Sequence, residues 1–377
     1  MKDNDEIQAV ILAAGEGTRL RPLTGNRPKV MLPAANKPIL SHVLNSVINA
    51  GIRDITVVVG YKKELVMEYL NRFGYDVKIA VQEKQLGTAD ALRCADEFIH
   101  TKTLIVSGDN YIDSQSIQQL SEKENAILVS SHEHPEFYGV ISQQKGVLTD
   151  IIEKPDFVES GALVSCGAYV LSKKLIKKAA VCSMTELIKN IIESGEKIEI
   201  VNAENWQDAS YPKDLLLMNS NLLKNTESVI SGTADKTAVI RGHVKIGKNS
   251  VIGPNSVITG PVSIGDDCII DSNVCIGPGT SIASRVKIEP FTYIENSIIM
   301  NDCAVGSHSR IADTVMSEGA VCFDHVSTIS DEIGAVISDR ATIGPFTILN
   351  GAKIGNNAKI SGGRTIKEDI PDDAMVI

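Results

Sequence analysis

The stretch "IGKNSVIGPNSVITGPVSIGDDCI", residues 246–269, repeats an isoleucine every six residues. The spacing holds without a gap from Ile240 to Ile294, and a second run covers Ile348 to Ile366. A period of six fits neither one amphipathic helix nor simple strand alternation, and it is typical of a repeat architecture. It predicts a coil of short parallel strands with the isoleucines stacked inward, over about residues 235–366 in roughly seven turns.

Other positions keep the same six-residue rhythm. The residue after each isoleucine is usually small or acidic, and Pro254, Pro278 and Pro290 lie two after it, which is suited to turns between strands. Between about residues 298 and 342 the rhythm slips. The slip has two interpretations that remain open: an irregular coil, or a loop that carries function.

The first half of the chain alternates short apolar runs with amphipathic stretches. This order predicts an α/β domain with a parallel sheet covered by helices, in which ligands bind at the carboxyl ends of the strands. We therefore expect two domains, residues 1–225 and 226–377. The expected elements are strands at 7–14, 54–60, 76–82 and 103–109, and helices at 38–51, 62–74 and 88–99.

Bulk properties narrow the class of protein. A length of 377 residues suits two domains, each with its own core. The net charge of −10 disfavours nucleic acid as a partner, and no apolar run reaches the ~18 residues of a membrane span. The N-terminal "MKDNDEIQ" is unlike a secretory signal, and seven cysteines without a CxxC pair suit reduced thiols. We expect a cytoplasmic protein with no membrane contact.

A glycine-containing loop follows the first expected strand, in "ILAAGEGTRLRPLTGNRPKVM", residues 11–31. It is not a Rossmann fingerprint, because Leu20 stands where the third glycine belongs, and it lacks the G-K-[ST] of a Walker loop. Backbone N–H groups of such a loop can nonetheless face phosphate oxygens. From the glycines alone, an ordinary tight turn remains the alternative.

The wider string "LAAGEGTRLRPLT…RPKVMLPAANKPIL" resembles the signature of the sugar-1-phosphate nucleotidylyltransferases. Further similar motifs follow in order: "QEKQLGTADAL" (82–92), "SGDN" (107–110), "FYGVI" (137–141), "IIEKP" (151–155) and "WQDASYPKDLL" (206–216). The resemblance covers both domains and is strongest to bifunctional archaeal and bacterial members. It implies a Rossmann-like, mostly parallel sheet followed by a left-handed parallel β-helix of hexapeptide repeats.

The resemblance also implies a reaction and its residues. A sugar-1-phosphate oxygen attacks the α-phosphorus of a nucleoside triphosphate and pyrophosphate leaves, so the protein chiefly aligns anions and neutralises charge. Gly15, Gly17 and Thr18 would face the triphosphate. Arg19 would hold the leaving pyrophosphate, and Lys29 would bridge the phosphates. Asp109, with Asp208, would hold Mg²⁺, a hard ion that suits carboxylates.

Substrate recognition is implied in the same way. The base would be read by Leu12, Ala13, Gly15, Gln82 and Gly87. Gly87 and Thr88 resemble the form found in uridylyltransferases, which makes UTP the first choice and dTTP the second. The sugar, glucose-1-phosphate or N-acetylglucosamine-1-phosphate, would meet Gly139, Glu153, Lys154 and Ser165. Two positions depart from the family pattern, because Ser165 replaces an expected Asn and Ser210 an expected Gly.

The β-helix lacks the acetyltransferase pattern of its relatives. Ser307 and Arg310 stand where that pattern has its general-base His and a Tyr, and His308 is one residue out of register. We therefore expect a structural β-helix that forms homo-trimers or hexamers. Two alternatives stay open: a bifunctional enzyme that also acetylates glucosamine-1-phosphate, and a catalytically weak regulatory subunit.

Overall fold

The structure, a computed structural model, describes residues 7–100, 102–176, 181–329 and 332–377. These residues form two compact units. The first contains the chain up to Glu16, together with Pro28–Met31 and Ile39–Asp208. The second contains Gly17–Arg27, Leu32–Pro38 and Ala209–Ile377. Two short segments near the N-terminus therefore belong to the same unit as the C-terminal coil.

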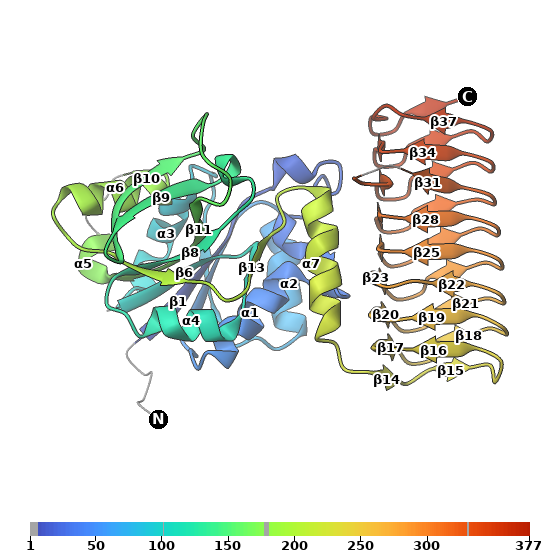
Figure 1. Cartoon of the computed structure of the whole chain (residues 1–377), viewed down its shortest axis with the longest axis horizontal. Helices are drawn as coiled ribbons and strands as arrows, with labels where there is room; N and C mark the ends of the chain where they lie inside the picture. The colour runs from blue at the N-terminus through green and yellow to red at the C-terminus, as the bar shows by residue number, and fades with distance from the viewer. Residues whose placement is uncertain (1–6, 101, 177–180, 330–331) are drawn as a thin grey trace. The chain divides into compact units, whose positions relative to one another are not determined.

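The first unit, which Figure 1 shows with its helices, is built on a nine-stranded sheet. The strand order is β5-β4-β1-β6-β11-β8-β12-β10-β9. Its first four strands run parallel. Beyond them β11 runs antiparallel to β6, β8 and β9, so the sheet as a whole is mixed. The strands are β1 (Ile7–Ala13), β4 (Ile55–Val59), β5 (Lys78–Val81), β6 (Lys102–Ser107), β8 (Ala126–Ser131), β9 (Gly139–Gln144), β10 (Val147–Glu153), β11 (Leu163–Ser172) and β12 (Glu199–Asn202).

Helices cover this sheet, and their ends follow local chemistry. Gly51, with φ of 93°, takes a conformation that only glycine adopts easily, so the first helix ends just before it. Ser183 and Glu186 form a capping box at the start of α6. The helices of this unit are α1 (Ile39–Asn49), α2 (Lys63–Arg72), α3 (Thr88–Cys94), α4 (Ser114–Ser121), α5 (Lys173–Ile176) and α6 (Met184–Glu193).

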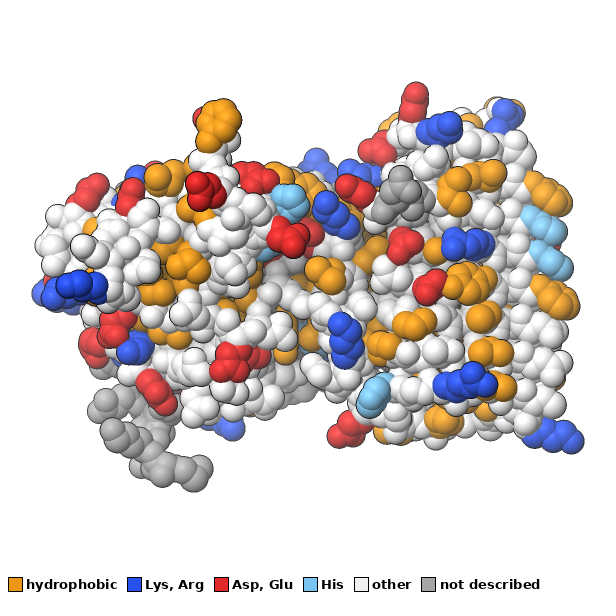
Figure 2. Space-filling view, in the orientation of Figure 1, with side chains coloured by type: hydrophobic (Ala, Val, Ile, Leu, Met, Phe, Trp, Pro, Cys, Tyr) orange, Lys and Arg blue, Asp and Glu red, His pale blue; other side chains and the backbone are white. Residues whose placement is uncertain are grey.

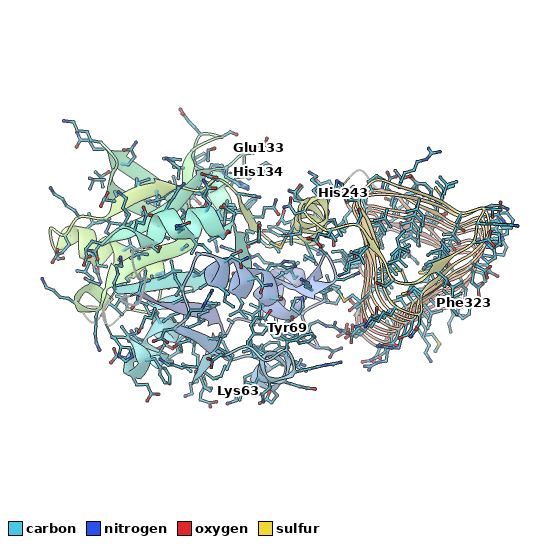
Figure 3. The ribbon with its side chains drawn as sticks, turned by 90° about the horizontal axis from the view of Figure 1, so that it is seen from below. Lys63, Tyr69, Glu133, His134, His243 and Phe323 are labelled. Carbon is cyan, nitrogen blue, oxygen red and sulfur yellow. The ribbon has the colours of Figure 1, made fainter. Side chains whose placement is uncertain are left out.

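The second unit is a parallel β-helix whose three sheets form the sides of a triangle when viewed along the coil (Figure 3). Each strand pairs in register with the strand one coil further on. The expected α/β fold with a left-handed β-helix is confirmed. One sheet contains β14 (Val229–Ile230), β17 (Val244–Ile246), β20 (Val262–Ile264), β23 (Thr280–Ile282), β26 (Ile298–Ile299), β29 (Thr314–Met316), β32 (Ala335–Ile337) and β35 (Lys353–Ile354).

The other two sheets complete the triangle in the same way. The second contains β15 (Thr233–Ala234), β18 (Val251–Ile252), β21 (Ile269–Ile270), β24 (Lys287–Ile288), β27 (Ala304–Val305), β30 (Val321–Cys322), β33 (Thr342–Ile343), β36 (Lys359–Ile360) and β38 (Met375–Val376). The third contains β16 (Val239–Arg241), β19 (Val257–Thr259), β22 (Cys275–Ile276), β25 (Tyr293–Glu295), β28 (Arg310–Ala312), β31 (Ser327–Ile329), β34 (Ile348–Asn350) and β37 (Thr365–Ile366).

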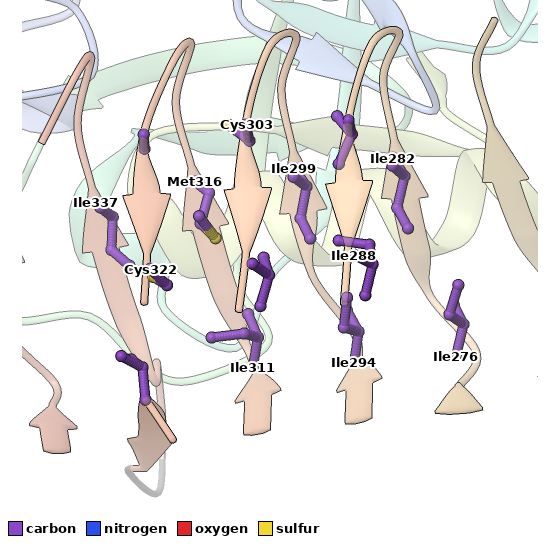
Figure 4. Packing of buried hydrophobic residues seen from close by; sticks show 14 of the residues in the cluster. Ile276, Ile282, Ile288, Ile294, Ile299, Cys303, Ile311, Met316, Cys322 and Ile337 are labelled. Carbon is purple, nitrogen blue, oxygen red and sulfur yellow. The ribbon is translucent and has the colours of Figure 1, made fainter. Parts of the chain in front are cut away.

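The repeating isoleucines stack inside the coil as expected (Figure 4). The β-helix continues through the stretch where the six-residue rhythm slips. What changes there is the number of residues in one coil. Ile264 pairs with Ile282, 18 residues on, whereas Ile282 pairs with Ile299, 17 residues on. Two turns later the spacing rises to 21, from Met316 to Ile337. The slip is therefore a change in coil length, and Met, Val and Cys replace some of the inward isoleucines.

The remaining elements are short except for one helix. α7 (Pro212–Lys224) precedes the coil and packs on its β23 and β29 strands within the second unit. β2 (Pro33–Ala34) pairs with β3 (Lys37–Pro38), and β7 (Asn110–Ile112) pairs with β13 (Trp206–Asp208). Within the described ranges, no helix has the length and hydropathy needed to cross a membrane.

Candidate active site

The expected base-binding residues of the first strand lie at the carboxyl edge of the parallel half of the sheet. Leu12 and Ala13 end β1, and Gly15 follows them on an exposed turn. Glycine allows the neighbouring strands to end close by: a Cβ on Gly108 would lie 2.9 Å from the Leu12 oxygen, and one on Gly60 2.8 Å from Ala14. This tight edge is the place where parallel sheets of this kind bind ligands.

Two carboxylates reach this edge from distant parts of the chain. Asp109 follows β6 directly, and the β7–β13 ribbon pairs Asp208 with Asn110. The ribbon thereby places Asp208 next to Asp109, although the two are far apart in sequence. The two residues expected to form one metal site are thus brought together.

Lys29 lies between these carboxylates. Its Nζ is 2.7 Å from Asp109 Oδ2 and 3.0 Å from Asp208 Oδ1. The Lys29 side chain is 8% exposed and that of Asp208 also 8%, whereas Asp109 is 33% exposed. Burial, the largest influence, lowers the pKa of Lys29, but the charges and hydrogen bonds of the two aspartates outweigh it and raise the pKa above the ordinary 10.5. Lys29 is therefore a buried, charged ammonium.

The same pair of carboxylates fits a divalent cation. Both direct an oxygen at one cationic atom, and carboxylate oxygens are the ligands that a hard ion such as Mg²⁺ prefers. Lys29 provides the positive charge at this position in the structure as it stands. A metal held by Asp109 and Asp208 would therefore have to compete with, or move, the Lys29 ammonium.

Gln82 lies at the same edge, directly after β5, and is 3% exposed. Its Nε2 donates to the Gly87 oxygen at 3.0 Å and to Asp90 Oδ2 at 2.8 Å. Both partners are acceptors, so the amide nitrogen is committed and the carbonyl oxygen is the atom left for a ligand. The Gln82 hydrogen bond is the first cause of a lowered pKa at Asp90. Asp90 was missed as a site residue, although it lies in the quoted "QLGTADA" motif.

Gly87 and Thr88 face another segment of the same unit. A Cβ on Gly87 would collide with the backbone of Cys182, and the Thr88 hydroxyl accepts a hydrogen bond from the Met184 N–H at 2.9 Å. Ala89 N–H also donates to the Cys182 oxygen. These two residues therefore fix the loop between β5 and α3 against the start of α6, which holds Gln82 in place.

The expected sugar-binding residues gather where β9, β10 and β11 meet. Gly139 pairs with Glu153 across β9 and β10, and a Cβ on Gly139 would lie 3.4 Å from Glu153 Oε2. Lys154 Nζ is 3.8 Å from Glu153 Oε1. Ser165 on β11 bonds the Tyr169 hydroxyl at 3.0 Å. Burial, the main cause, together with the nearby Glu153 charge, raises the pKa of Tyr169 to about 12.

Two further side chains at this place were missed from the sequence. Tyr169 is 6% exposed, and its hydroxyl stays protonated and bonded to Ser165. Thr185 donates from its hydroxyl to Glu153 Oε2 at 2.8 Å, which orients that carboxylate. Tyr169 lies four residues after Ser165 on the same strand, but Thr185 comes from α6, and no sequence motif connects it to Glu153.

Three of the residues expected to bind the triphosphate belong to the second unit, namely Gly17, Thr18 and Arg19. Gly17 has φ of 80°, which favours glycine, and it precedes a short 3-10 helix, Thr18–Leu20. The Arg19 guanidinium carbon lies 5.6 Å from the centre of the Tyr211 ring, a cation–π geometry. Thr18 and Arg19 are both exposed and available to an anionic ligand.

His308 occupies an outer corner of the coil. Its ring stacks at 5.0 Å on Phe291 and at 4.9 Å on His325, which stacks in turn on Phe346. Figure 2 shows histidine side chains between hydrophobic side chains along one edge of the β-helix. All four residues have positive φ, like Asn255 and Asn273 at the corners of earlier coils.

Comparison with known proteins identifies the family of this chain. The family model described as nucleotidyl transferase matches residues 8–225, more than half of the chain. The chain belongs to the nucleotidyl transferase family. Within the β-helix, a model of bacterial transferase hexapeptide repeats matches residues 233–260, and one described as the GMPPB C-terminal domain matches residues 258–362.

Relatives of this family member are similar over almost their whole length. "Bifunctional protein GlmU" of Methanococcus vannielii is 32% identical, over 98% of this chain and 97% of the relative. "Bifunctional sugar-1-phosphate nucleotidylyltransferase/acetyltransferase" of Sulfurisphaera tokodaii is 29% identical, over 97% and 98%. "Low-salt glycan biosynthesis nucleotidyltransferase Agl11" of Haloferax volcanii is 29% identical, over 83% and 93%. The expected family is confirmed.

Proposed function

We propose that this protein transfers a nucleotidyl group from UTP or dTTP to a sugar-1-phosphate, giving a nucleotide-sugar and pyrophosphate. The observation that carries the proposal is Lys29, a buried ammonium held between Asp109 and Asp208 at the carboxyl edge of the sheet. Such a group neutralises phosphate charge where it develops, which is the main demand of phosphoryl transfer. Relatives with this activity in their names support the same assignment.

The proposed chemistry is one in-line displacement. An oxygen of the sugar-1-phosphate forms a bond to the α-phosphorus as the bond from that phosphorus to the β-phosphate oxygen breaks. Lys29 would contact the phosphates at the reacting centre. Gly15, Gly17 and Thr18 would offer N–H groups to the triphosphate, and Arg19 would hold the departing pyrophosphate.

We propose Mg²⁺ as the cofactor, held by Asp109 and Asp208. When bound, it would supply a hard positive charge to the phosphate oxygens and keep several waters. The protein itself directs the two carboxylates at one position. It also excludes water from Asp208, whose side chain is 8% exposed.

The choice of substrates is proposed from the two halves of the site. The carbonyl oxygen of Gln82 is suited to accept the ring N–H that uracil and thymine both carry. Leu12, Ala13, Gly87 and Thr88 would support the same base. Glucose-1-phosphate or N-acetylglucosamine-1-phosphate would meet Glu153, Lys154, Gly139 and Ser165. Because Ser165 bonds Tyr169, a hydroxyl pair stands where the family pattern led us to expect an amide.

A substrate panel tests this proposal. The purified full chain is given each nucleoside triphosphate with each of several sugar-1-phosphates, and pyrophosphate release is followed with Mg²⁺ or EDTA. We expect turnover with UTP or dTTP and a gluco-configured sugar-1-phosphate, and none in EDTA. No turnover with any pair would contradict the proposal and favour a regulatory subunit.

A second candidate function concerns the β-helix, because several relatives carry "bifunctional" in their names. We propose that this coil does not acetylate sugars, since Ser307 stands at the expected base position and the His308 ring is stacked between Phe291 and His325. The test is acetyl transfer from acetyl-CoA to glucosamine-1-phosphate by the purified chain. Acetylation above the uncatalysed rate would overturn this proposal.

We propose that the β-helix assembles the chain into trimers or hexamers. We also propose that the chain divides into two domains, residues 1–225 and 226–377. Val251 and Ile269 are neighbours on one sheet and are 47% and 50% exposed, an apolar surface suited to a second copy. Light scattering should therefore report a trimer or hexamer for the full chain and a smaller mass for Val251→Lys/Ile269→Lys. An unchanged mass would reject this surface.

A further inference from the structure

The loop from Gly17 to Arg27 is held by two sets of contacts. Just outside its two ends, the Lys29 N–H donates a hydrogen bond to the Glu16 oxygen at 3.2 Å, within the first unit. The residues in between lie against the β-helix, within the second unit. Asn26 and Arg27 precede Lys29 in the "GNRPK" stretch, and the proposed reaction gives them no role.

Asp339, on the turn after β32, accepts hydrogen bonds from both of these residues. Arg27 Nη2 donates to Asp339 Oδ1 at 2.8 Å, and Asn26 Nδ2 donates to Oδ2 at 3.0 Å. The Ser317 hydroxyl also donates to Oδ1. Asp339 is 7% exposed and the Arg27 side chain 12%, so this is a buried, charged contact with each aspartate oxygen used. Burial, the largest single influence, raises the pKa of the Asp339 carboxyl. The Arg27 charge and the hydrogen bonds together lower it by more, so this pKa lies below its ordinary value.

Other contacts fix the loop at the same place. Asn26 Nδ2 also donates to Asn356 Oδ1 at 3.2 Å, and a Cβ on Gly25 would lie 3.2 Å from Asn356 Nδ2. A larger residue than glycine there would require its neighbours to shift by a few tenths of an ångström. The loop is ordered internally as well, since Thr24 bonds the Gly17 oxygen at 3.0 Å and Leu23 is 1% exposed.

The segment on the other side of Lys29 has its own anchor. Asn36 Nδ2 donates to the Ile282 oxygen at 2.8 Å and to the Ser263 hydroxyl at 3.1 Å, both on the β-helix. Ala35 N–H donates to Asn219 Oδ1 at 2.8 Å, on α7. Both chain segments that flank Pro28–Met31 are therefore attached to the C-terminal unit.

We infer that Asp339 of the β-helix is a positioning residue for nucleotide binding, because it fixes the loop that carries Gly17, Thr18 and Arg19. The coil then supports nucleotide binding through this loop, in addition to any role in assembly. This inference rests on the proposed function for the link to catalysis, whereas the anchoring itself is independent of it. Residues of the coil lie more than 300 positions from the loop, so no local motif indicates the contact.

The test combines hydrogen exchange with kinetics on the full chain. Asp339→Asn removes the charge from the coil side, and Asn26→Ala weakens the same contact from the loop side without altering the coil. Asp302→Asn is the matched control, because Asp302 also binds an arginine in two places, Arg285 at 2.7 and 2.8 Å, but at an exposed surface. Amide exchange is measured over residues 17–25, where the N–H groups of Leu20, Arg21, Leu23 and Gly25 are bonded within the loop.

We expect faster exchange at residues 17–25 in Asp339→Asn and Asn26→Ala, and no change in Asp302→Asn. The KM for the nucleoside triphosphate should rise, and kcat/KM for it should fall about tenfold or more, as expected for a lost hydrogen bond to a charged group. The KM for the sugar-1-phosphate should stay the same. A purely structural role would lower the amount of active protein and leave both KM values unchanged.

Unchanged exchange in both loop-contact variants would overturn the inference, as would faster exchange with an unchanged KM for the nucleotide. A wild-type chain without turnover would count against the proposed function instead, and the exchange comparison would still decide whether Asp339 anchors the loop.

Discussion

Replacing Lys29 with methionine tests the buried pair of carboxylates most sharply. The change keeps an apolar stem of similar length but removes the ammonium that lies 2.7 Å from Asp109 and 3.0 Å from Asp208. Removing one partner of a buried pair costs about 3–5 kcal/mol, because the remaining charge has no partner. Asp109 is one-third exposed, so solvent screens part of this cost and we expect about 3 kcal/mol.

Mg²⁺ bound between the two carboxylates should then restore the stability that the Lys29 charge supplied. In EDTA, urea denaturation should give Lys29→Met a free energy of unfolding about 3 kcal/mol below wild type. Mg²⁺ at about a hundred times its Kd should return roughly 2.7 kcal/mol to the variant. It should add less to wild type, where the ammonium competes for the same oxygens. Lys63→Met is the control, since Lys63 (Figure 3) forms an exposed pair with Glu83 and its loss should change little.

The pH dependence follows from the raised pKa of Lys29. The stability that its charge contributes is fully present below its ordinary pKa of 10.5 and is lost only as pH rises through the higher folded value. The difference between wild type and Lys29→Met should therefore be constant across the neutral range. The reasoning is refuted if the variant in EDTA is as stable as wild type, or if Mg²⁺ stabilises both equally.

Three further predictions concern turnover. Asp109→Asn should nearly abolish pyrophosphate release with the circular dichroism spectrum unchanged, and retained activity would remove Asp109 from the metal site. Asp90→Ala should raise the KM for UTP with little effect on kcat, because it removes one of the two acceptors that hold the Gln82 amide; equal KM values would show that Asp90 does not orient Gln82. Ser165→Asn should change the KM for the sugar-1-phosphate and leave that for the nucleotide alone; a change in the nucleotide KM would place Ser165 elsewhere.

The repeat architecture was predictable because its signal is periodic and local. Each inward isoleucine reports the same burial, so Ile246, Ile264 and Ile282 predict their own stacking. The continuity of the coil through residues 298–342 was not predictable. There Met316 and Cys322 fill inward positions, and the coil changes from 18 to 17 residues, which removes the fixed spacing without removing the strands.

The candidate site was predictable only in part, because its residues come from separate strands. Asp109 follows an apolar strand and Lys29 follows the glycine loop, so both were indicated by position and by family resemblance. Their direct contact depends on the β7–β13 ribbon, which pairs residues about a hundred positions apart. The bond from Thr185 to Glu153 and the bond from Arg27 to Asp339 are likewise products of the fold alone.

In the proposed reaction, the nucleoside monophosphate group of UTP or dTTP, which carries the α-phosphorus, moves to the sugar-1-phosphate. The most direct measurement uses UTP or dTTP labelled at either the α- or the γ-phosphate, with a sugar-1-phosphate and Mg²⁺. We predict that the α-label appears in the nucleotide-sugar and the γ-label in pyrophosphate, and that Lys29→Met and Asp109→Asn each suppress both products. A γ-label on the sugar, or an α-label that stays in the nucleoside triphosphate, would contradict this transfer.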